Sequence, residues 1–363
     1  MGRPGENKMK YRMIELQRTR AETTNTTRTI DLDIATPISR IVIRMKGTNT
    51  TSTPVGHPAR MISRIELVDG SDVIYSLTGV EAEALNFIEN SELPYNCCEY
   101  ELPIEVCTTA QLNFGRELWD REFALDPKRF TNLQLKVTNA VGSGGSTAGT
   151  CTLAIFAYVF EDSPPMPRGF LMAKELKSYT VVNAQHEYTE LPKDYPFRFV
   201  ILQSYDTNMP PNTIFGNLKF TIDTDRKIIL NDISMTEYLK AHIPMDKVEE
   251  EFGGLGTAAL LPYYLASTYN NYGVAVGRSA NSAALFVAQP AGQTMAVLGN
   301  VGVSFACMAV GYCAFGAMNL VQADKMDPTS WLDPRGTMSV KLDITGGGAG
   351  TAYIIAQQAR TYS

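Results

Sequence analysis

Residues on which enzymes usually depend are scarce in this sequence of 363 residues. It has three histidines and two tryptophans, and neither a His-Glu-x-x-His segment nor a Cys-x-x-Cys pair occurs. Zinc sites and metalloproteases commonly use such closely spaced ligands. The glycines at 253–254 and 346–348 lack the Lys and Ser/Thr that complete a phosphate-binding loop. We therefore predict no catalytic residue, no metal ligand and no bound cofactor.

Disulfides and export also have little support in the sequence. The six cysteines include the adjacent Cys97 and Cys98, which cannot readily bridge each other. Residues 1–20 lack the apolar core of a secretory signal, so free cysteines in a reducing cytoplasm are expected. The formal net charge of −6 is unlike that of a protein with a basic nucleic-acid-binding face. No sequence-specific nucleic-acid partner is predicted.

Charge is nearly absent from one long stretch. Between Phe252 and Gln322 the only charged residue is Arg278. Residues 301–321 are uncharged and numerous enough to span a bilayer, but they contain three glycines and have no basic flank on the N-terminal side. An exposed apolar surface of this size would aggregate. We therefore predict an elaborated loop region that packs against other subunits, in preference to a membrane span.

The sequence contains an internal repeat. Residues 126–129, Asp-Pro-Lys-Arg, return 207 residues later as Asp-Pro-Arg at 333–335. Apolar residues then fall at every second position in both copies, which predicts a strand with one buried face. These residues are Leu133, Leu135 and Val137 in the first copy, and Val340, Leu342 and Ile344 in the second.

Other matches run in the same order along the chain. Residues 31–43 match 190–202 at a spacing of 159, and residues 73–77 match 229–233 at a spacing of 156. Both copies then offer a helix start of the capping-box type, with Thr78 in the first and Ser234 in the second. Short strands, turns and one small helix in each copy predict an all-β fold with short helices. We predict two tandem eight-stranded jelly-roll sandwiches in one chain.

Prolines and charge suggest the boundaries of the two copies. Three prolines in residues 164–167 cannot continue a strand ladder. The predicted parts are an N-terminal basic arm at 1–24, the first jelly roll at 25–162, a Pro-rich linker at 163–180, and a second jelly roll at 181–363 whose large loop insertion occupies about 250–325.

The first 20 residues carry six basic and two acidic side chains. Apolar residues lie between these charges in a short amphipathic pattern. One interpretation is a frayed, solvated terminus. The other is an arm that contacts an anionic surface such as lipid headgroups. The candidate contact residues are Arg3, Lys8, Lys10, Arg12, Arg18 and Arg20.

One local pattern resembles a known family. Asn113-Phe114-Gly115-Arg116, followed by Asp120 and the corner at Asp126, is similar to a pattern in the double jelly-roll major capsid proteins of tailless icosahedral viruses, the PRD1–adenovirus-like lineage. The tandem copies, the Pro-rich stretch and the basic terminus resemble that family over nearly the whole chain. The second copy has no clear Phe-Gly-Arg counterpart.

The resemblance implies a structural protein of the virion. Three copies would form a pseudo-hexagonal capsomer, and loops at one end would form outer towers. The implied partners are further copies in the capsid lattice, minor capsid and vertex proteins, and the lipid of an internal membrane, towards which the N-terminal arm points. Assembly would take place in the cytoplasm of the host, for example a bacterium infected by a bacteriophage.

Physical reasoning agrees with this expectation and leaves two alternatives. A duplicated sandwich gives one chain two equivalent wedges, so a closed ring of three chains presents six. The first alternative is a two-domain jelly-roll hydrolase that acts on carbohydrates, because paired carboxylates from distant strands leave no local signature. The second is a receptor-binding or lectin-like surface protein.

Overall fold

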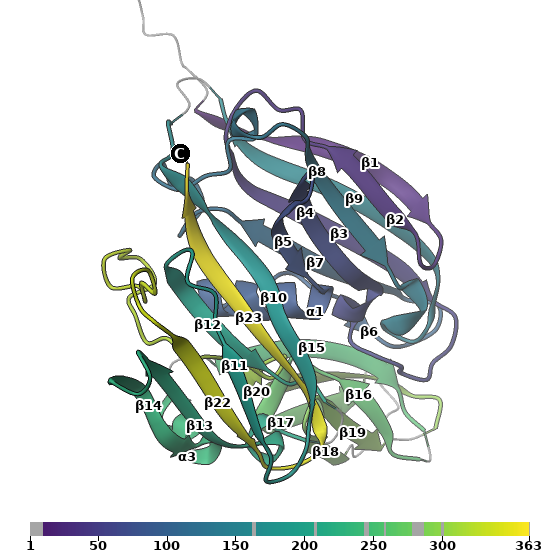
Figure 1. The fold of residues 1–363 in the computed structure, drawn as a ribbon. Coiled ribbons are helices and arrows are strands. Elements are labelled where there is room, and N and C mark those ends of the chain that lie inside the picture. The colour runs from purple at the N-terminus through teal and green to yellow at the C-terminus, as the bar shows by residue number, and fades with distance from the viewer. Residues whose placement is uncertain are drawn as a thin grey trace, which may run out of the picture.

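The computed structural model describes residues 10–161, 165–206, 209–242, 247–257, 259–277, 287–298 and 301–362. Two jelly rolls lie side by side, and an insertion of further strands extends from one end (Figure 1). The predicted all-β class and the double jelly roll are confirmed.

The first jelly roll has eight strands in two sheets. One sheet has the order β1-β9-β3-β7, and the strands of the other run β2-β8-β4-β5. The bounds are β1 Tyr11–Glu22, β2 Thr27–Asp31, β3 Ile38–Asn49, β4 Ile62–Asp69, β5 Asp72–Leu77, β7 Glu105–Asn113, β8 Leu133–Asn139 and β9 Ala148–Phe160, with helix α1 Gly79–Asn90 and the short strand β6 Cys98–Glu99 between β5 and β7.

The second jelly roll repeats this arrangement strand for strand. Its strands run β10-β23-β12-β21 and β11-β22-β13-β14. The bounds are β10 Gly169–Val181, β11 His186–Glu190, β12 Phe197–Gln203, β13 Phe215–Ile222, β14 Lys227–Ser234, β21 Ala317–Asn319, β22 Val340–Gly346 and β23 Gly350–Thr361, with the helices α2 Pro211–Ile214 and α3 Met235–His242. The connection order is therefore the same in both copies.

The equivalence extends to the register of the strands. The β1–β9 ladder shifts between Glu15 and Gln17, as the β10–β23 ladder does between Glu175 and Lys177; a further shift between Gln17 and Arg20 is found in β1 alone. Each shift adds one residue to the first strand of its jelly roll, as a β-bulge does. The two bulges lie 160 residues apart, and the residues opposite them, Phe156 and Ile355 in the last strands, lie 199 apart.

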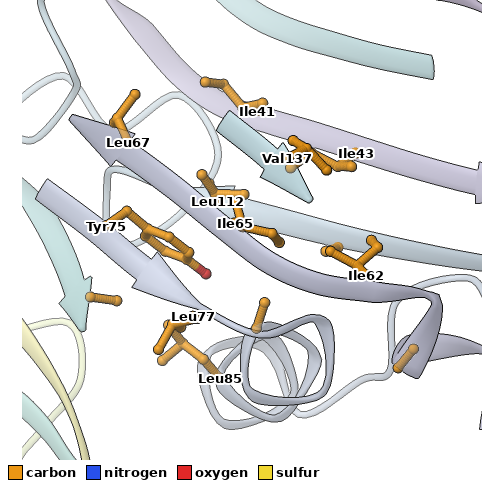
Figure 2. Packing of buried hydrophobic residues seen from close by; sticks show 14 of the residues in the cluster. Ile41, Ile43, Ile62, Ile65, Leu67, Tyr75, Leu77, Leu85, Leu112 and Val137 are labelled. Atoms are coloured by element: carbon orange, nitrogen blue, oxygen red, sulfur yellow. The ribbon is translucent and has the colours of Figure 1, made fainter. Parts of the chain in front are cut away.

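The repeated strand motif fills the same core position in each copy. The alternate residues are all buried: Leu133, Leu135 and Val137 in β8, and Val340, Leu342 and Ile344 in β22. Figure 2 shows how side chains of the two sheets and of α1 meet in the first core. Thr78 and Glu81 form the expected capping box at the start of α1. The hydroxyl of Ser234 accepts a hydrogen bond from the N–H of Glu237 at the start of α3.

The two jelly rolls are joined through one sheet. Strand β5 pairs in parallel with β10, where Tyr75 lies beside Ala173 and Ser76 beside Lys174. Half of each jelly roll thereby enters an eight-stranded sheet with the order β2-β8-β4-β5-β10-β23-β12-β21. Side chains on the outer face of β12 and β23 belong to the same apolar cluster as α1. The first core therefore continues across the joint.

The insertion lies between α3 and β21 and forms strands of its own. They are β15 Lys247–Leu255, β16 Leu261–Tyr264, β17 Ser267–Gly277, β18 Val287–Ala291, β19 Thr294–Leu298 and β20 Ser304–Ala314. One sheet has the order β17-β20-β15-β6 and so includes a strand of the first jelly roll, and the other runs β16-β19-β18. Among the described residues, no helix is long and apolar enough to cross a membrane.

Two of the predicted boundaries are wrong. Residues 11–22 of the expected arm form β1, and residues 169–180 of the expected linker form most of β10. Each is the first strand of its jelly roll. The charged residues of β1 made it resemble a solvated arm in the sequence. β1 is an edge strand whose polar side chains face solvent, and charge on an edge strand discourages pairing with other chains. Residues 1–9 and 162–164 lie outside the described residues.

Candidate functional site

A buried arginine lies at the centre of the joint between the jelly rolls. The side chain of Arg198, in β12, is fully buried. Its Nη1 lies 3.4 Å from Oε1 of Glu89 in α1 and 3.0 Å from Oε1 of Gln357 in β23. Its Nη2 donates to the carbonyl of Arg116 at 3.1 Å, and its Nε donates to the carbonyl of Lys325 at 3.0 Å.

The polar groups around Arg198 also form hydrogen bonds with one another. Glu89 also accepts from the amides of Gln357 at 2.7 Å and Asn113 at 2.5 Å. Burial lowers the pKa of the Arg198 guanidinium from its ordinary value, and the Glu89 carboxylate opposes this shift. A buried ion pair with complete hydrogen bonding adds little net stability, but it permits only one arrangement of its partners. This network therefore fixes how the second jelly roll sits on α1.

The Phe-Gly-Arg pattern belongs to the same joint. Nε of Arg116 lies 2.7 Å from Oδ2 of Asp120, and the Arg116 carbonyl accepts from Arg198. A Cβ on Gly115 would lie 2.6 Å from the Cβ of Asp120 and from the carbonyl oxygen of Phe123, so only glycine fits this turn. The described part of the chain contains one such joint, which explains why the second copy has no counterpart of the pattern.

A second buried cluster attaches the insertion to the first jelly roll. His57 precedes a short 3₁₀ turn, Cys98 lies in β6, and Glu250 lies in β15. Nε2 of His57 is 2.9 Å from Oε1 of Glu250, and Sγ of Cys98 is 3.6 Å from the same nitrogen and 3.4 Å from the same oxygen. The ligand atoms of the three residues lie close enough together to raise the question of a metal ion.

Hydrogen bonding decides against metal binding or nucleophilic catalysis by this cluster. The N–H of Ala59 donates to Nδ1 of His57 at 3.1 Å, which places the ring proton of neutral His57 on Nε2. A metal at Nε2 would need the opposite tautomer. Burial raises the pKa of the Cys98 thiol well above its ordinary value, so the nucleophilic thiolate is disfavoured. Glu250 instead accepts from His57, from Cys98 and, at 2.8 Å, from the N–H of Ala266.

We call the cluster of His57, Cys98 and Glu250 the anchor of the insertion. No local pattern in the sequence could have identified it. His57 and Cys98 are 41 positions apart in the sequence, and Cys98 and Glu250 are 152 positions apart. A single histidine near a turn predicts nothing by itself. The three residues come together only in the folded chain, where the insertion packs against the first jelly roll.

A buried carboxyl group of α1 lies near this anchor. Glu83 is fully buried and hydrogen-bonded to the hydroxyl of Thr108 and to the amide of Asn96. Burial raises the pKa of Glu83 to about 7, although His57 and the two hydrogen bonds act in the opposite direction. Its protonation state therefore changes near neutral pH.

Four of the six predicted lipid-contact residues are described, and they lie at or in the edge strand β1. Lys10 and Arg20 are exposed. Arg12 pairs with Glu161 at 2.8 Å, and Arg18 lies 3.8 Å from Glu15. Arg3 and Lys8 lie outside the described residues. The structure brings the four onto one edge, and their contact with lipid stays a prediction.

The insertion exposes an apolar sheet face. Val274 in β17 and Met308 in β20 are direct neighbours, exposed by 67% and 49% respectively. Tyr272 and Val276 flank Val274 on the same side of β17 and are exposed by 55% and 58%. The opposite face of this sheet packs into a separate apolar cluster. A contiguous exposed apolar face of this kind is typical of an interaction surface.

Comparison with known proteins identifies the class of fold. No protein-family model and no curated protein matches the sequence. Solved structures that match over nearly the whole chain include viral major capsid proteins, and the chain shares their double jelly-roll fold.

The individual likenesses are distant in sequence but cover both chains. The major capsid protein of bacteriophage PM2 is 11% identical, with a TM-score of 0.54, over 97% of this chain and 98% of that one. The STIV major capsid protein is 11% identical, with a TM-score of 0.60, over 98% and 97%. A chain in the atomic structure of Sulfolobus turreted icosahedral virus is 12% identical, with a TM-score of 0.59, over 98% and 91%.

The joint network predicts a strong coupling between Glu89 and Arg198. Replacing Arg198 by Met leaves a buried carboxylate without its cation, so we expect a loss of about 3–5 kcal/mol in stability. The double variant Glu89→Gln/Arg198→Met should recover much of that loss. Thermal unfolding followed by calorimetry measures both. Lys240→Met, which removes an exposed pair with Glu237, is the matched control and should change little; equal losses in the single and double variants would contradict the coupling.

The raised pKa of Glu83 predicts that the free energy of unfolding falls as the pH rises. Its pKa in the folded chain, about 7, lies above its ordinary value of 4.5, so its contribution is complete below pH 4.5 and is lost as the pH rises through 7. Glu83→Gln should therefore raise stability at pH 8.5 by about 1–3 kcal/mol and have little effect at pH 5. Melting curves at the two pH values test this. The exposed Glu92→Gln is the control, and a gain for Glu83→Gln that does not depend on pH would refute the titration.

Proposed function

We propose that this chain is a non-enzymatic major capsid protein of an icosahedral virus and that three copies form one pseudo-hexagonal capsomer. The observation that carries the proposal is the joining of two jelly rolls of identical strand order by the parallel β5–β10 pair. Proteins that share this fold over nearly their full length are major capsid proteins. The shell of the virion is the proposed location.

The duplicated architecture of the chain supports assembly of three copies. Two equivalent units side by side act as two wedges, so a closed ring of three chains has six similar units around its axis. Such a ring tiles a hexagonal lattice. The proposed partners are the other copies in the capsomer, neighbouring capsomers, and the minor capsid and vertex proteins that complete a shell.

The insertion supplies the surface that this assembly would bury. Its exposed apolar face around Val274 and Met308 is suited to a permanent subunit contact, because obligate interfaces are rich in apolar side chains. The anchor at Glu250 would hold that face in a fixed orientation. The insertion lies at the end of the molecule away from the start of β1 (Figure 1), as expected of an outer tower.

The surroundings of the two tryptophans favour this function over carbohydrate binding. Sugar-binding clefts usually present an open aromatic face. Trp119 instead stacks on Tyr11 with ring centroids 4.5 Å apart. Trp331 is buried and packs against Phe123 at 5.8 Å. Both rings therefore serve packing within the chain.

An internal membrane is the proposed neighbour of the N-terminal end. The proposed contact residues are Arg3, Lys8, Lys10, Arg12, Arg18 and Arg20, of which the first three precede β1 in the sequence. A lysine or arginine near an anionic membrane surface contributes about 1 kcal/mol, and salt weakens the contribution.

The capsomer proposal predicts a stable trimer. Three copies of 39.9 kDa correspond to about 120 kDa, and apolar burial should keep them together at micromolar concentration. Light scattering coupled to size exclusion measures the mass directly. A clean monomer of the folded chain under these conditions would remove the capsomer from the proposal.

The membrane proposal predicts salt-sensitive binding to vesicles that contain an anionic lipid. Replacing Arg3, Lys8 and Lys10 by Gln should weaken binding roughly a hundredfold at low salt without changing the fold. A triple variant with Lys193, Lys240 and Lys341 replaced by Gln removes the same charge from the second jelly roll and should bind normally. Co-sedimentation gives the affinities, and equal losses in the two variants would contradict a specific role of the terminus.

A further inference from the structure

The joint inside the chain uses two particular strands. It pairs β5, the last strand in the second sheet of the first jelly roll, with β10, which begins the first sheet of the second. Because the two jelly rolls are equivalent, each of these strands has a counterpart. The counterpart of β5 is β14, and that of β10 is β1.

Both counterparts are free to pair. Strand β14 ends the sheet β11-β22-β13-β14, and β1 ends the sheet β1-β9-β3-β7, so each has one edge without a strand neighbour in the part of the chain that the structure describes. The unpaired edges carry exposed apolar side chains. They are Ile228 and Ile229 on β14, exposed by 49% and 37%, and Tyr11 and Met13 on β1, exposed by 53% and 57%.

The sheet face next to β1 corresponds to the face that the internal joint covers. In the second jelly roll, Phe199 and Ile355 on that face are packed in the cluster that includes α1. At the spacings of 159 and 199 their counterparts are Arg40 and Phe156, and both are only partly buried. The first jelly roll thus leaves partly exposed, beside Trp119, the positions that the second one buries.

We propose that β14 and α3 of one copy dock on β1 and the adjoining sheet face of a second copy, and so repeat between chains the parallel joint found within each chain. The proposal rests on the proposed capsomer and names the contact that builds it. The contact is head to tail, and it closes into a ring of three chains when each joint turns one jelly roll by a sixth of a full rotation about a common axis.

The internal joint also gives the register of the contact. Tyr75 lies opposite Leu67 in the first jelly roll, and the equivalent position opposite Phe220 in the second is Leu230. Tyr75 and Ala173 are neighbours in the internal joint, so their counterparts are Leu230 and, at a spacing of 160, Met13. Two residues earlier, Ile228 would lie beside Tyr11, because parallel strands keep a constant offset. Asp232 has a φ of 49°, so the regular pairing should end before it.

Disulfide trapping tests this register. In the double variant Met13→Cys/Leu230→Cys, mild oxidation should link separate chains, because β1 and β14 lie at opposite ends of one molecule (Figure 1). Non-reducing gels should show dimers and trimers within one capsomer, with few larger species. Each single variant should give no ladder. The pair Met13→Cys/Tyr188→Cys is the matched control, because Tyr188 is exposed but lies in β11, at the other edge of its sheet.

An association measurement separates this inference from the capsomer itself. Ile228→Lys should weaken trimer formation roughly tenfold, and Tyr188→Lys should leave it unchanged. A normal trimer with no Met13–Leu230 link and no effect of Ile228→Lys would overturn the contact while the capsomer stands. A folded monomer of the unmodified chain would overturn both. Links that form equally in the control pair would also refute the register.

Discussion

The parallel pairing of β5 with β10 is the constraint on which the rest of the structure depends. An edge strand has unpaired N–H and C=O groups, and joining two edges satisfies both at once. The pairing also sets the rotation of one jelly roll relative to the other. Glu89 and Arg198 then lie directly beneath the joined sheet, where a buried charge is tolerated only with its full set of partners. The backbone pairing and the ion pair therefore select the same arrangement.

The duplication could be predicted from the sequence because strands with one buried face leave a period of two, and capped helices leave a local signature. The repeated core residues from Leu133 and Val340 onwards and the cap at Thr78 are examples. Strand β1 was missed because charge in an edge strand resembles a solvated segment, and β10 was missed because the prolines at 164–167 suggest a linker that reaches into it. Arg198 could not be predicted from its local sequence, because its partner Glu89 is 109 residues away and arginine is rarely buried.

The insertion shows how a stretch almost without charged residues is held in one orientation on the first jelly roll. Its inner face packs into a cluster of aromatic and sulfur-containing side chains, among them Phe252 and Met295. Glu250 stands beside this cluster and ties it through His57 and Cys98 to the first jelly roll. One ionised or polar group with several donors can set an orientation that apolar packing alone leaves open. The outer face is then free to remain apolar for a partner.

The two copies differ where their neighbours differ. Arg198 of the second jelly roll corresponds to Ser39 of the first, which uses its hydroxyl to accept from the N–H of Trp119 at 2.8 Å. Arg198 is needed because α1 covers it with the buried carboxylate of Glu89. Ser39 is also buried, but against the segment of its own jelly roll that carries Trp119. The two copies thus differ at this position because a helix with a buried carboxylate covers it in one, and a turn that needs only a hydroxyl acceptor covers it in the other.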